Sequence, residues 1–289
     1  MRKLPTTFML LGLVASPASA EPVIVAAGDI ACDPDVRVTE RTCRHRSTSN
    51  LVLRLDPTRV LALGDTQYEE GELANFNRSY DPTWGRFFGK TRPTVGNHEY
   101  RTPGAAGYWS YFGSRAGPRG RGWYSFDLGA WHLIALNSNC SRVGCGPTSE
   151  QVRWLRNNLR ANDDRCELVF PHHPRWSSGP HGGRAYLDPI WDVLYAEGVD
   201  VVLSGDNHQY ERFALQNANG VAAADGVRQF VVGTGGRSLY DFGPAQPNSQ
   251  VRIKAFGVIK LTLRADRYAW SFQRLNGTSP DSGSKGCHA

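Results

Sequence analysis

The 289-residue sequence lacks several features that define other classes of protein. Residues 8–15 form an apolar stretch that is too short to span a bilayer, and no later segment approaches the roughly 20 apolar residues of a transmembrane helix. The chain also has no run of Lys or Arg, no low-complexity tract, no linker and no internal repeat. We therefore expect no membrane span, no nucleic-acid surface and one domain.

Two common functional motifs are incomplete. The stretch 233–236 is rich in Gly but lacks the Lys and Ser/Thr that complete a phosphate-binding P-loop. Ser177 and Ser178 lack the Gly-x-Ser-x-Gly setting of a serine nucleophile. Neither a P-loop enzyme nor a serine hydrolase is supported.

Residues 1–20 have the pattern of a cleaved secretory signal, with Arg2 and Lys3 before an apolar stretch and small residues at the end. We expect residues 21–289 to form a single mature domain that is secreted or periplasmic. Without Arg2 and Lys3 the 33 basic residues become 31, which against 27 acidic residues leaves a net charge of +4. This mild excess is compatible with an anionic substrate.

The six cysteines favour disulfides over a zinc site or a nucleophile, because their number is even, the chain is expected to be exported and none forms a Cys-x-x-Cys pair. Their connectivity cannot be deduced from the sequence. Proximity favours Cys32 with Cys43 and Cys140 with Cys145, which leaves Cys166 to hold the tail at Cys287.

Five apolar runs predict strands, and each ends at Gly, Pro or Asn before polar residues. The runs begin at 23, 59, 92, 166 and 199. Helices are predicted at 147–162, with a capping pair at Thr148 and Gln151, and at 187–198, which Gly198 ends. Stretches 122–138 and 256–275 predict antiparallel hairpins. We expect an α/β fold of two face-to-face mixed β-sheets flanked by helices.

The polar residues after the five strands suggest one shared site, because ligands of open α/β sheets collect beyond the carboxyl ends of the strands. Their carboxylate, amide and imidazole groups suit first-row transition metals, and a set this large suits two ions. The residues in question are Asp29, Asp65, Tyr68, Asn97, His98, His172, Asp206 and His208.

In order and spacing, these blocks resemble the calcineurin-like metallophosphoesterases, and specifically the purple acid phosphatase branch. The resemblance rests on Asp29 after a strand, "GDTQY" at 64–68, "GNHE" at 96–99, "PHHP" at 171–174 and "GDNHQYER" at 205–212. Position 31 is Ala where most of the family has His. The purple branch replaces that ligand by a tyrosine, which is Tyr68 here. The resemblance implies the sandwich fold of that family and hydrolysis of a small phosphate ester.

The ligand sets follow from the resemblance, residue by residue. One metal, typically Fe(III) in that branch, would be held by Asp29, Asp65, Tyr68 and His208. The second, a divalent Fe, Mn or Zn ion, would be held by Asp65, Asn97, His172 and the residue at position 206.

Position 206 departs from the family, which has His where this chain has Asp206. A carboxylate can bind a divalent ion, but it adds a negative charge. Fe(III) and a divalent ion carry +5, and Asp29, Asp65, ionised Tyr68 and Asp206 carry −4, so a bridging hydroxide leaves the ligand shell neutral instead of +1. A less positive site attracts phosphate less and acidifies bound water less.

The resemblance also implies the chemistry. A metal-activated hydroxide would attack the phosphate ester, and His98, oriented by Glu99, would protonate the leaving alkoxide. His181 is a second catalytic candidate in a Gly/Ser/Pro loop. His173 is a weaker candidate for the site, and three arginines are candidate phosphate contacts: Arg175, Arg212 and Arg237.

Two functions remain open. The first is an exported binuclear-metal phosphoesterase. The alternative is a phosphate- or nucleotide-binding homologue in which Asp206 has degraded the second metal site and little catalysis remains. The substrate, whether monoester, diester or nucleotide, and the identity of the second metal are not determined by the sequence.

Overall fold

Two mixed β-sheets form the centre of the molecule. The computed structural model describes residues 21–162 and 165–288, so the predicted signal at 1–20 lies outside the described residues. The six-stranded sheet has the order β13 (Ser282–Gly286), β12 (Arg267–Arg274), β11 (Gly257–Leu263), β1 (Val23–Ala27), β2 (Arg59–Leu63) and β3 (Thr91–Thr94). The seven-stranded sheet has the order β10 (Ser249–Ile253), β8 (Tyr210–Gln216), β9 (Val227–Val232), β7 (Val201–Ser204), β6 (Cys166–Phe170), β5 (Trp131–Ala135) and β4 (Tyr124–Leu128).

Parallel pairing occurs where the polar blocks follow the strands. Strands β1, β2 and β3 are parallel neighbours in one sheet, with Val25 opposite Val60, and β6 and β7 are parallel neighbours in the other, with Val169 opposite Val202. Antiparallel hairpins β4–β5 and β11–β12 lie where residues 122–138 and 256–275 predicted them. The predicted α/β class with two mixed sheets is confirmed.

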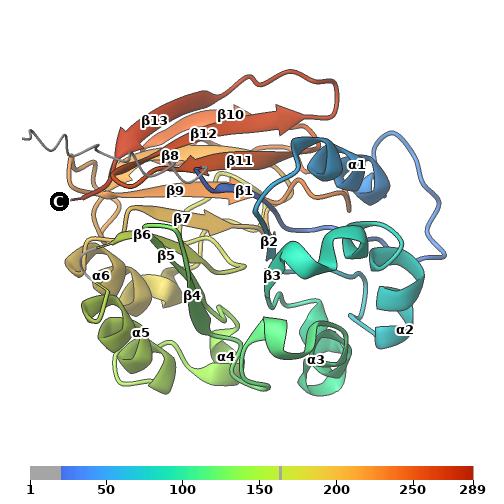
Figure 1. The fold of residues 1–289 in the computed structure, drawn as a ribbon, viewed down its shortest axis with the longest axis horizontal. Helices are drawn as coiled ribbons and strands as arrows, with labels where there is room; N and C mark the ends of the chain where they lie inside the picture. Colours follow the sequence, from blue (N-terminus) through green and yellow to red (C-terminus); the bar gives the residue numbers. More distant parts are fainter. Residues whose placement is uncertain (1–20, 163–164, 289) are drawn as a thin grey trace, which may run out of the picture.

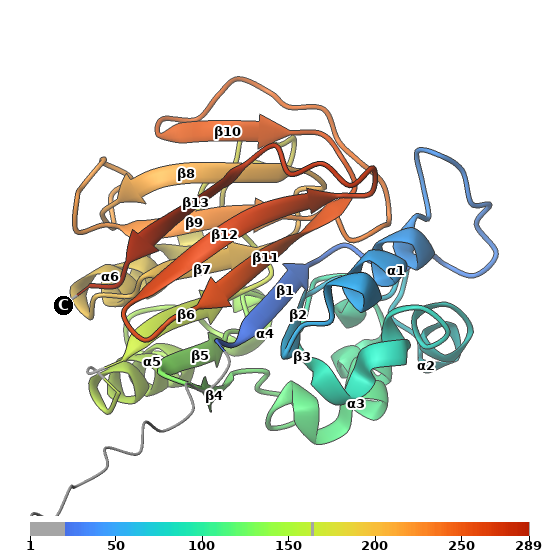
Figure 2. The ribbon, with the colours of Figure 1, turned by 45° about the horizontal axis from the view of Figure 1, so that its top comes forward.

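The seven-stranded sheet buries both faces, which explains its continuous apolar strands. In β6, Leu168 and Phe170 belong to the core that contains residues of both sheets, while Val169 packs in a second cluster with Leu155 and Trp191 of the helices. This alternation is the two-residue period of a strand. Figure 2 shows β11, β12 and β13 lying over the strands of the other sheet.

Helices flank the two sheets. Figure 1 shows α5 and α6 together on one side of the molecule and α1, α2 and α3 on the other. The α-helices are α1 (His45–Leu55), α2 (Leu73–Asn75), α3 (Ala106–Phe112), α4 (Cys140–Val143), α5 (Glu150–Arg160) and α6 (Asp188–Ala196). Short 3₁₀ or π turns lie at Phe76–Tyr80, Trp84–Lys90, Glu99–Arg101, Pro103–Ala105, Gly113–Ala116 and Ala185–Leu187. Within the described ranges, no helix is long and apolar enough to cross a membrane.

The helix predicted at 147–162 is present as α5, but its predicted cap was wrong by one residue. Ser149, not Thr148, is the N-cap, and its Oγ accepts the N–H of Val152 at 3.3 Å. Gln151 is buried instead and brackets Asn137: its Oε1 accepts the Asn137 N–H, and its Nε2 donates to the Asn137 carbonyl. The Gln151 side chain therefore binds Asn137 instead of forming the predicted capping pair with Thr148.

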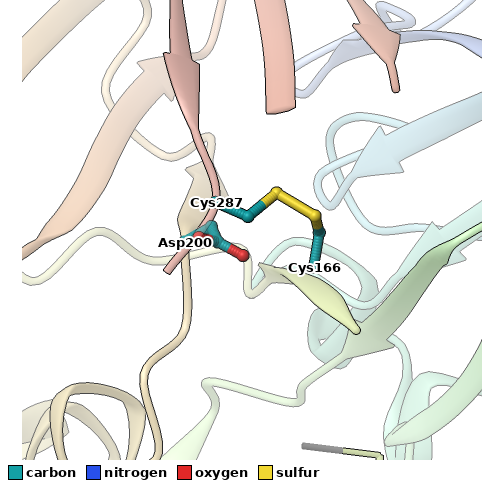
Figure 3. Close-up of side chains that lie close together, drawn as sticks. All are labelled: Cys166, Asp200 and Cys287. Carbon is teal, nitrogen blue, oxygen red and sulfur yellow. A yellow bond between two sulfur atoms is a disulfide. The ribbon is translucent and has the colours of Figure 1, made fainter. Parts of the chain in front are cut away.

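All six cysteines form the disulfides that proximity favoured: Cys32–Cys43, Cys140–Cys145 and Cys166–Cys287. The last links β6 to the chain after β13, across 121 residues of sequence. Asp200 lies beside that bond (Figure 3) and forms with the two cysteines a group of potential metal ligands. Because both sulfurs are in the disulfide, they are not thiolate ligands, and Asp200 instead accepts the N–H groups of Glu167 and His288.

Candidate metal centre

The five polar blocks meet at one place. Each follows the carboxyl end of β1, β2, β3, β6 or β7, and a cavity of about 630 Å³ opens there. The residues that line it include seven predicted for the site: Asp65, Tyr68, Asn97, His98, His181, Asp206 and His208. Asp29 and His172 lie beneath, each fully buried. The structure thus brings the predicted site residues together at one place beyond the strand ends.

Three of the strand ends share one backbone conformation. Asp29, Asp65 and Asp206 each follow a Gly, and each has a positive φ, of 60°, 44° and 66°. This left-handed region is uncommon for residues other than Gly, although Asp and Asn tolerate it best. The turn ends each strand abruptly and directs the carboxylate toward the cavity edge.

Asp29, Tyr68 and His208 form what we call the tyrosine half-site. The Tyr68 hydroxyl lies 2.8 Å from Asp29 Oδ1, 3.1 Å from Asp65 Oδ2 and 2.9 Å from His208 Nε2. Nδ1 of His208 contacts Ser238 Oγ at 2.9 Å, which leaves Nε2 facing the cluster. Tyr68 therefore contacts the other three predicted ligands of the first metal, and His208 Nε2 also lies 3.3 Å from Asp29 Oδ1.

The electrostatics of the tyrosine half-site call for a cation. Burial, followed by the charges of Asp29 and Asp65, raises the pKa of Tyr68 well above its ordinary value. With protein groups alone the phenol therefore keeps its proton. Ionised Tyr68 requires a positive charge placed among these oxygens.

One oxygen of Asp29 provides a direct test of whether a metal fits. Asp29 Oδ2 is buried and has no hydrogen-bond partner among the described residues. A Cβ added at Gly205 or at Gly233 would come within 2.7 Å of that oxygen, so glycine is needed at both positions. A buried carboxylate oxygen without a donor is costly unless a cation binds it, and the donor set here suits a transition metal.

Asn97, His172 and Asp206 form what we call the Asp206 half-site. Nδ1 of His172 lies 2.8 Å from the Leu63 carbonyl oxygen, which can only accept a hydrogen bond. Nδ1 therefore carries a proton, and Nε2 is the nitrogen that faces the site. That Nε2 lies 3.1 Å from Asn97 Oδ1 and 3.4 Å from Asp65 Oδ2. Asp65 therefore stands between the two half-sites, as a bridging ligand would.

His172 and Asp65 shift each other's pKa in opposite directions. Burial lowers the pKa of His172, but the charge of Asp65 and the contact with it outweigh burial and raise the pKa to about 10. Burial likewise raises the pKa of Asp65, yet His172 and then His98 lower it overall. The protein groups alone thus place a proton where a cation would bind.

Asp206 is 6% exposed and faces two groups. Its Oδ2 accepts from Arg184 Nη2 at 3.2 Å, and its Oδ1 lies 4.0 Å from His173 Nε2. A nitrogen of His172, a nitrogen of His173 and an oxygen of Asp206 all lie within 4.8 Å of one another. Burial raises the pKa of Asp206, while the charges of His172 and Arg184 oppose the rise.

His98 lies at the cavity with one nitrogen committed. Its Nδ1–H donates to the Glu69 carbonyl at 2.7 Å, and its Nε2 lies 3.2 Å from Arg101 Nη2. Its own backbone N–H donates to Asp65 Oδ1 at 2.8 Å. The position of His98 therefore depends on Glu69 and on the loop that holds Asp65.

The role expected for Glu99 was wrong. Glu99 does not orient the His98 ring; it is fully buried and accepts the backbone N–H groups of Asp65, Thr66, Gln67 and Gly96. Burial, followed by the charge of Asp65, raises the pKa of Glu99 to about 7. The physical reason is tertiary: the turns after β2 and β3 lie side by side and expose N–H groups that a single carboxylate satisfies, and so Glu99 ties the Asp65 loop to the Asn97 loop.

A family model now decides which family of proteins this site belongs to. The model described as calcineurin-like phosphoesterase matches residues 22–210, about two thirds of the chain and all the strands that carry the cluster. The chain belongs to the calcineurin-like phosphoesterase family. Within that family it resembles the purple acid phosphatase branch.

A curated relative supports that branch, and two solved structures share the fold. Purple acid phosphatase 21 of Arabidopsis thaliana is 28% identical over 271 residues, which cover 84% of this chain and 59% of the plant protein. The purple acid phosphatase PPD1 from yellow lupin seeds has a TM-score of 0.75 and 19% identity, covering 93% of this chain and 54% of that one. GAP50, described as the anchor in the inner membrane complex of Plasmodium, has a TM-score of 0.71 and 14% identity, covering 94% of this chain and 90% of that one.

The two structural matches show the fold alone, because their identities are low. The chain also spans about half the length of the curated relatives that it matches. Membership in the phosphoesterase family therefore rests on the family model, and the activity of this chain is a separate question.

Three arginines line the cavity, and the sequence pattern indicated one of them. Arg237 lines it, pairs with Glu69 and lies over the Tyr68 ring. Arg101 and Arg184 were missed, since nothing in the sequence distinguishes them from the other basic residues.

The other two arginine candidates were wrong: Arg175 pairs with Asp188, and Arg212 with Asp281. Neither lines the cavity. Each guanidinium is paired with a carboxylate elsewhere in the fold, and the sequence around each arginine did not predict that pairing.

The two remaining histidines lie at the cavity in different ways. His173 is 6% exposed, and its Nδ1 contacts Ser138 Oγ at 2.8 Å. His181 is more exposed, its N–H donates to Asn207 Oδ1, and its ring lies 5.3 Å from that of Tyr240. Both line the cavity, so both can reach a bound group.

Proposed function

We propose that this protein is an exported phosphoesterase that hydrolyses phosphate esters with two bound metal ions. The observation that carries the proposal is the tyrosine half-site: the buried Tyr68 hydroxyl contacts Asp29 Oδ1, Asp65 Oδ2 and His208 Nε2, while Asp29 Oδ2 has no hydrogen-bond donor among the described residues. Membership in the calcineurin-like phosphoesterase family supports the reaction class. A small phosphate ester is the proposed substrate.

Seven side chains would hold the two ions. We assign Fe(III) to the tyrosine half-site and a divalent Fe, Mn or Zn ion to the Asp206 half-site, with Asp65 shared. The first set is Asp29, Asp65, Tyr68 and His208, and the second is Asp65, Asn97, His172 and Asp206. When bound, the ions would supply positive charge for the phosphate and lower the pKa of a water to near neutral.

The remaining catalytic work falls to residues of the chain. Because His98 commits Nδ1–H to the Glu69 carbonyl, Nε2 is the nitrogen that can deliver a proton to the leaving alkoxide. We assign His181, which lines the same cavity, a contact with the substrate phosphate. Glu99 would hold the loops of Asp65 and Asn97 together, because its carboxylate accepts backbone N–H groups from both.

Export is supported by two independent features. Three disulfides persist in oxidising compartments and are rare in the cytosol. Residues 1–20 carry the pattern of a cleaved secretory signal.

One observation favours the alternative function, a phosphate- or nucleotide-binding homologue with little catalysis. Asp206 stands where the family has a histidine ligand, and it forms an ion pair with Arg184. If that pair blocks the second ion, the protein would hold a phosphate group without turnover.

Elemental analysis together with a panel of phosphate esters distinguishes the two functions. The phosphoesterase should retain two metals per chain and hydrolyse p-nitrophenyl phosphate. A protein with one metal or none, which binds phosphate but turns over no ester of the panel, would establish the alternative.

Colour tests the assignment of Fe(III) to Tyr68. An iron-bound phenolate should give a visible charge-transfer band in the oxidised protein, and Tyr68→Phe should remove it while iron content stays near that of the wild type. Tyr240→Phe is a matched control, because Tyr240 also adjoins His208 but lies outside the proposed ligand set. An iron-loaded wild-type protein without the band would disprove the Tyr68 assignment.

A further inference from the structure

The ion pair between Arg184 and Asp206 is a built feature of the site. Asn207, adjacent to Asp206 and fully buried, accepts the N–H of His181 and donates to the carbonyl of Gly182. The Arg184 N–H donates to the carbonyls of Pro174 and Arg175, and a Cβ added at Gly183 would come within 2.1 Å of that Arg175 oxygen. The contacts with Pro174 and Arg175 fix the fold of the Arg184 loop, and the two bonds of Asn207 hold that loop against Asp206.

The guanidinium contacts both oxygens of the Asp206 carboxylate, and the shorter contact is to Oδ2. Arg184 Nη2 lies 3.2 Å from Asp206 Oδ2, and its Nη1 donates to the His181 carbonyl at 3.1 Å. Asp206 Oδ1 faces His173, and the imidazole of His172 lies near it. Ligating carboxylates are commonly oriented by hydrogen bonds from residues that do not bind the metal themselves.

Charge gives the pair a second consequence. A histidine ligand is neutral, whereas Asp206 adds one negative charge to the ligand shell. Arg184 adds one positive charge at 3.2 Å, so the two residues together are neutral, as the histidine would be. The departure from the family pattern at position 206 is thereby compensated within the same site.

We propose that Arg184 is a positioning residue that makes Asp206 a working substitute for the histidine ligand, by fixing its carboxylate and by restoring the positive charge that attracts phosphate. This inference rests on the proposed function. On this proposal, the Asp206 half-site keeps its affinity for phosphate only while Arg184 is present.

A charge-balance experiment tests the proposal without relying on turnover. Binding of inorganic phosphate to the metal-loaded protein is measured by calorimetry for wild type, Arg184→Gln, Asp206→His and the double variant. Removing the positive charge should weaken phosphate binding about tenfold, and removing the negative charge should strengthen it about tenfold, the scale of one charge several ångströms away. The double variant should return to the wild-type affinity.

Two controls separate the compensation from a local disturbance. Arg184→Lys keeps the charge and should bind phosphate within about threefold of wild type. Arg175→Gln removes an arginine from the same loop that is paired with Asp188 and does not line the cavity, so its phosphate affinity should not change. Melting temperatures of all variants verify that each is folded.

Each other outcome has a defined meaning. A double variant as weak as Arg184→Gln would show that Arg184 binds phosphate directly, which overturns the compensation. Unchanged affinity in both single variants would overturn it as well. A wild-type protein that binds neither metals nor phosphate would overturn the proposed function itself, and this inference with it.

Discussion

The two half-sites differ in the partners that they provide for a buried carboxylate. In the tyrosine half-site, Asp29 is fully buried and keeps one oxygen without a hydrogen-bond donor. In the Asp206 half-site, both oxygens of Asp206 lie within 3.4 Å of an arginine. The first arrangement is complete only with a cation, whereas the second already contains one.

The difference shows that two sites on one scaffold can depend on a metal to different degrees. Asp29 and Asp206 both follow a Gly at a strand end and both adopt a positive φ, so their backbones are alike. What separates them is the loop at 181–184, which reaches Asp206 and not Asp29. Removing the shared ligand, the proton donor or Asp206 should therefore give effects of decreasing size.

The largest effect is expected for Asp65→Ala, because Asp65 contacts both half-sites. Both metals should be lost, and turnover should fall by more than the roughly 10⁴-fold that a general acid can contribute. Elemental analysis and p-nitrophenyl phosphate hydrolysis measure the two effects. A variant that keeps either metal at full occupancy would contradict the role of Asp65 as the bridge.

His98→Ala should have the next largest effect, and on the rate alone. Loss of a general acid typically lowers kcat by roughly 10²- to 10⁴-fold, and the metal content should not change. The matched control is His181→Ala, which removes a cavity histidine that is not the proposed proton donor and should cost less in kcat. Loss of metal in His98→Ala would make His98 a ligand, and full activity would deny it any catalytic role.

Asp206→Ala addresses the second half-site directly. The divalent ion should bind at least 10- to 100-fold more weakly, since even changes outside the ligand shell have effects of that size, while the iron and its colour should survive. Metal competition with a chelator gives the affinity. If both metals stay tightly bound, Asp206 is a turn residue held by Arg184, and the comparison between the half-sites loses its basis.

The smallest effect concerns stability at acid pH and lies outside the site. His45, at the start of α1, is 9% exposed, and its Nδ1 has no hydrogen-bond partner within the described part of the chain. Burial, assisted by the charge of Arg46, lowers its pKa from 6.5 to about 4. The unfolded chain therefore binds a proton in that interval that the folded chain does not, so the free energy of unfolding should decrease as pH falls from 6.5 to about 4.

The loss should reach at most about 3.5 kcal/mol, at about 1.4 kcal/mol per unit of pKa over the decrease from 6.5 to about 4. Urea denaturation at pH 7 and pH 4.5 measures it, and His45→Gln should flatten the dependence. If the variant keeps the wild-type pH dependence, other groups control acid stability. The result also defines the pH range in which metal loss from either half-site can be measured on folded protein.

Much of the cluster was predictable because its residues follow strands directly. The carboxyl ends of β1, β2 and β3, and of β6 and β7, lie at the same edges of parallel pairs, so apolar runs that stop at Gly-Asp or at Pro-His place their polar residues together. The disulfides followed similarly from proximity, and from the one pair left over.

The partners of these residues were not predictable in the same way. Ser149 caps α5 while Gln151 binds Asn137, and Glu99 accepts four backbone N–H groups instead of contacting His98. Such choices depend on which groups the fold leaves unsatisfied nearby. A sequence pattern describes the residue and its neighbours along the chain, but not the competition for its side chain.

The sequence by itself determined the strand ends and the identity of the side chains that follow them, because periodicity and turn chemistry are local and need no partner. Only the tertiary structure decided that Arg184 lies against Asp206, 22 residues further along the chain. The physical reason is that an ion pair of this kind forms where the fold brings two loops together, here through the hydrogen bonds of Asn207 to His181 and Gly182. Because the Arg184 guanidinium lies against the Asp206 carboxylate, its positive charge offsets the negative charge that Asp206 adds at the position of the family's histidine.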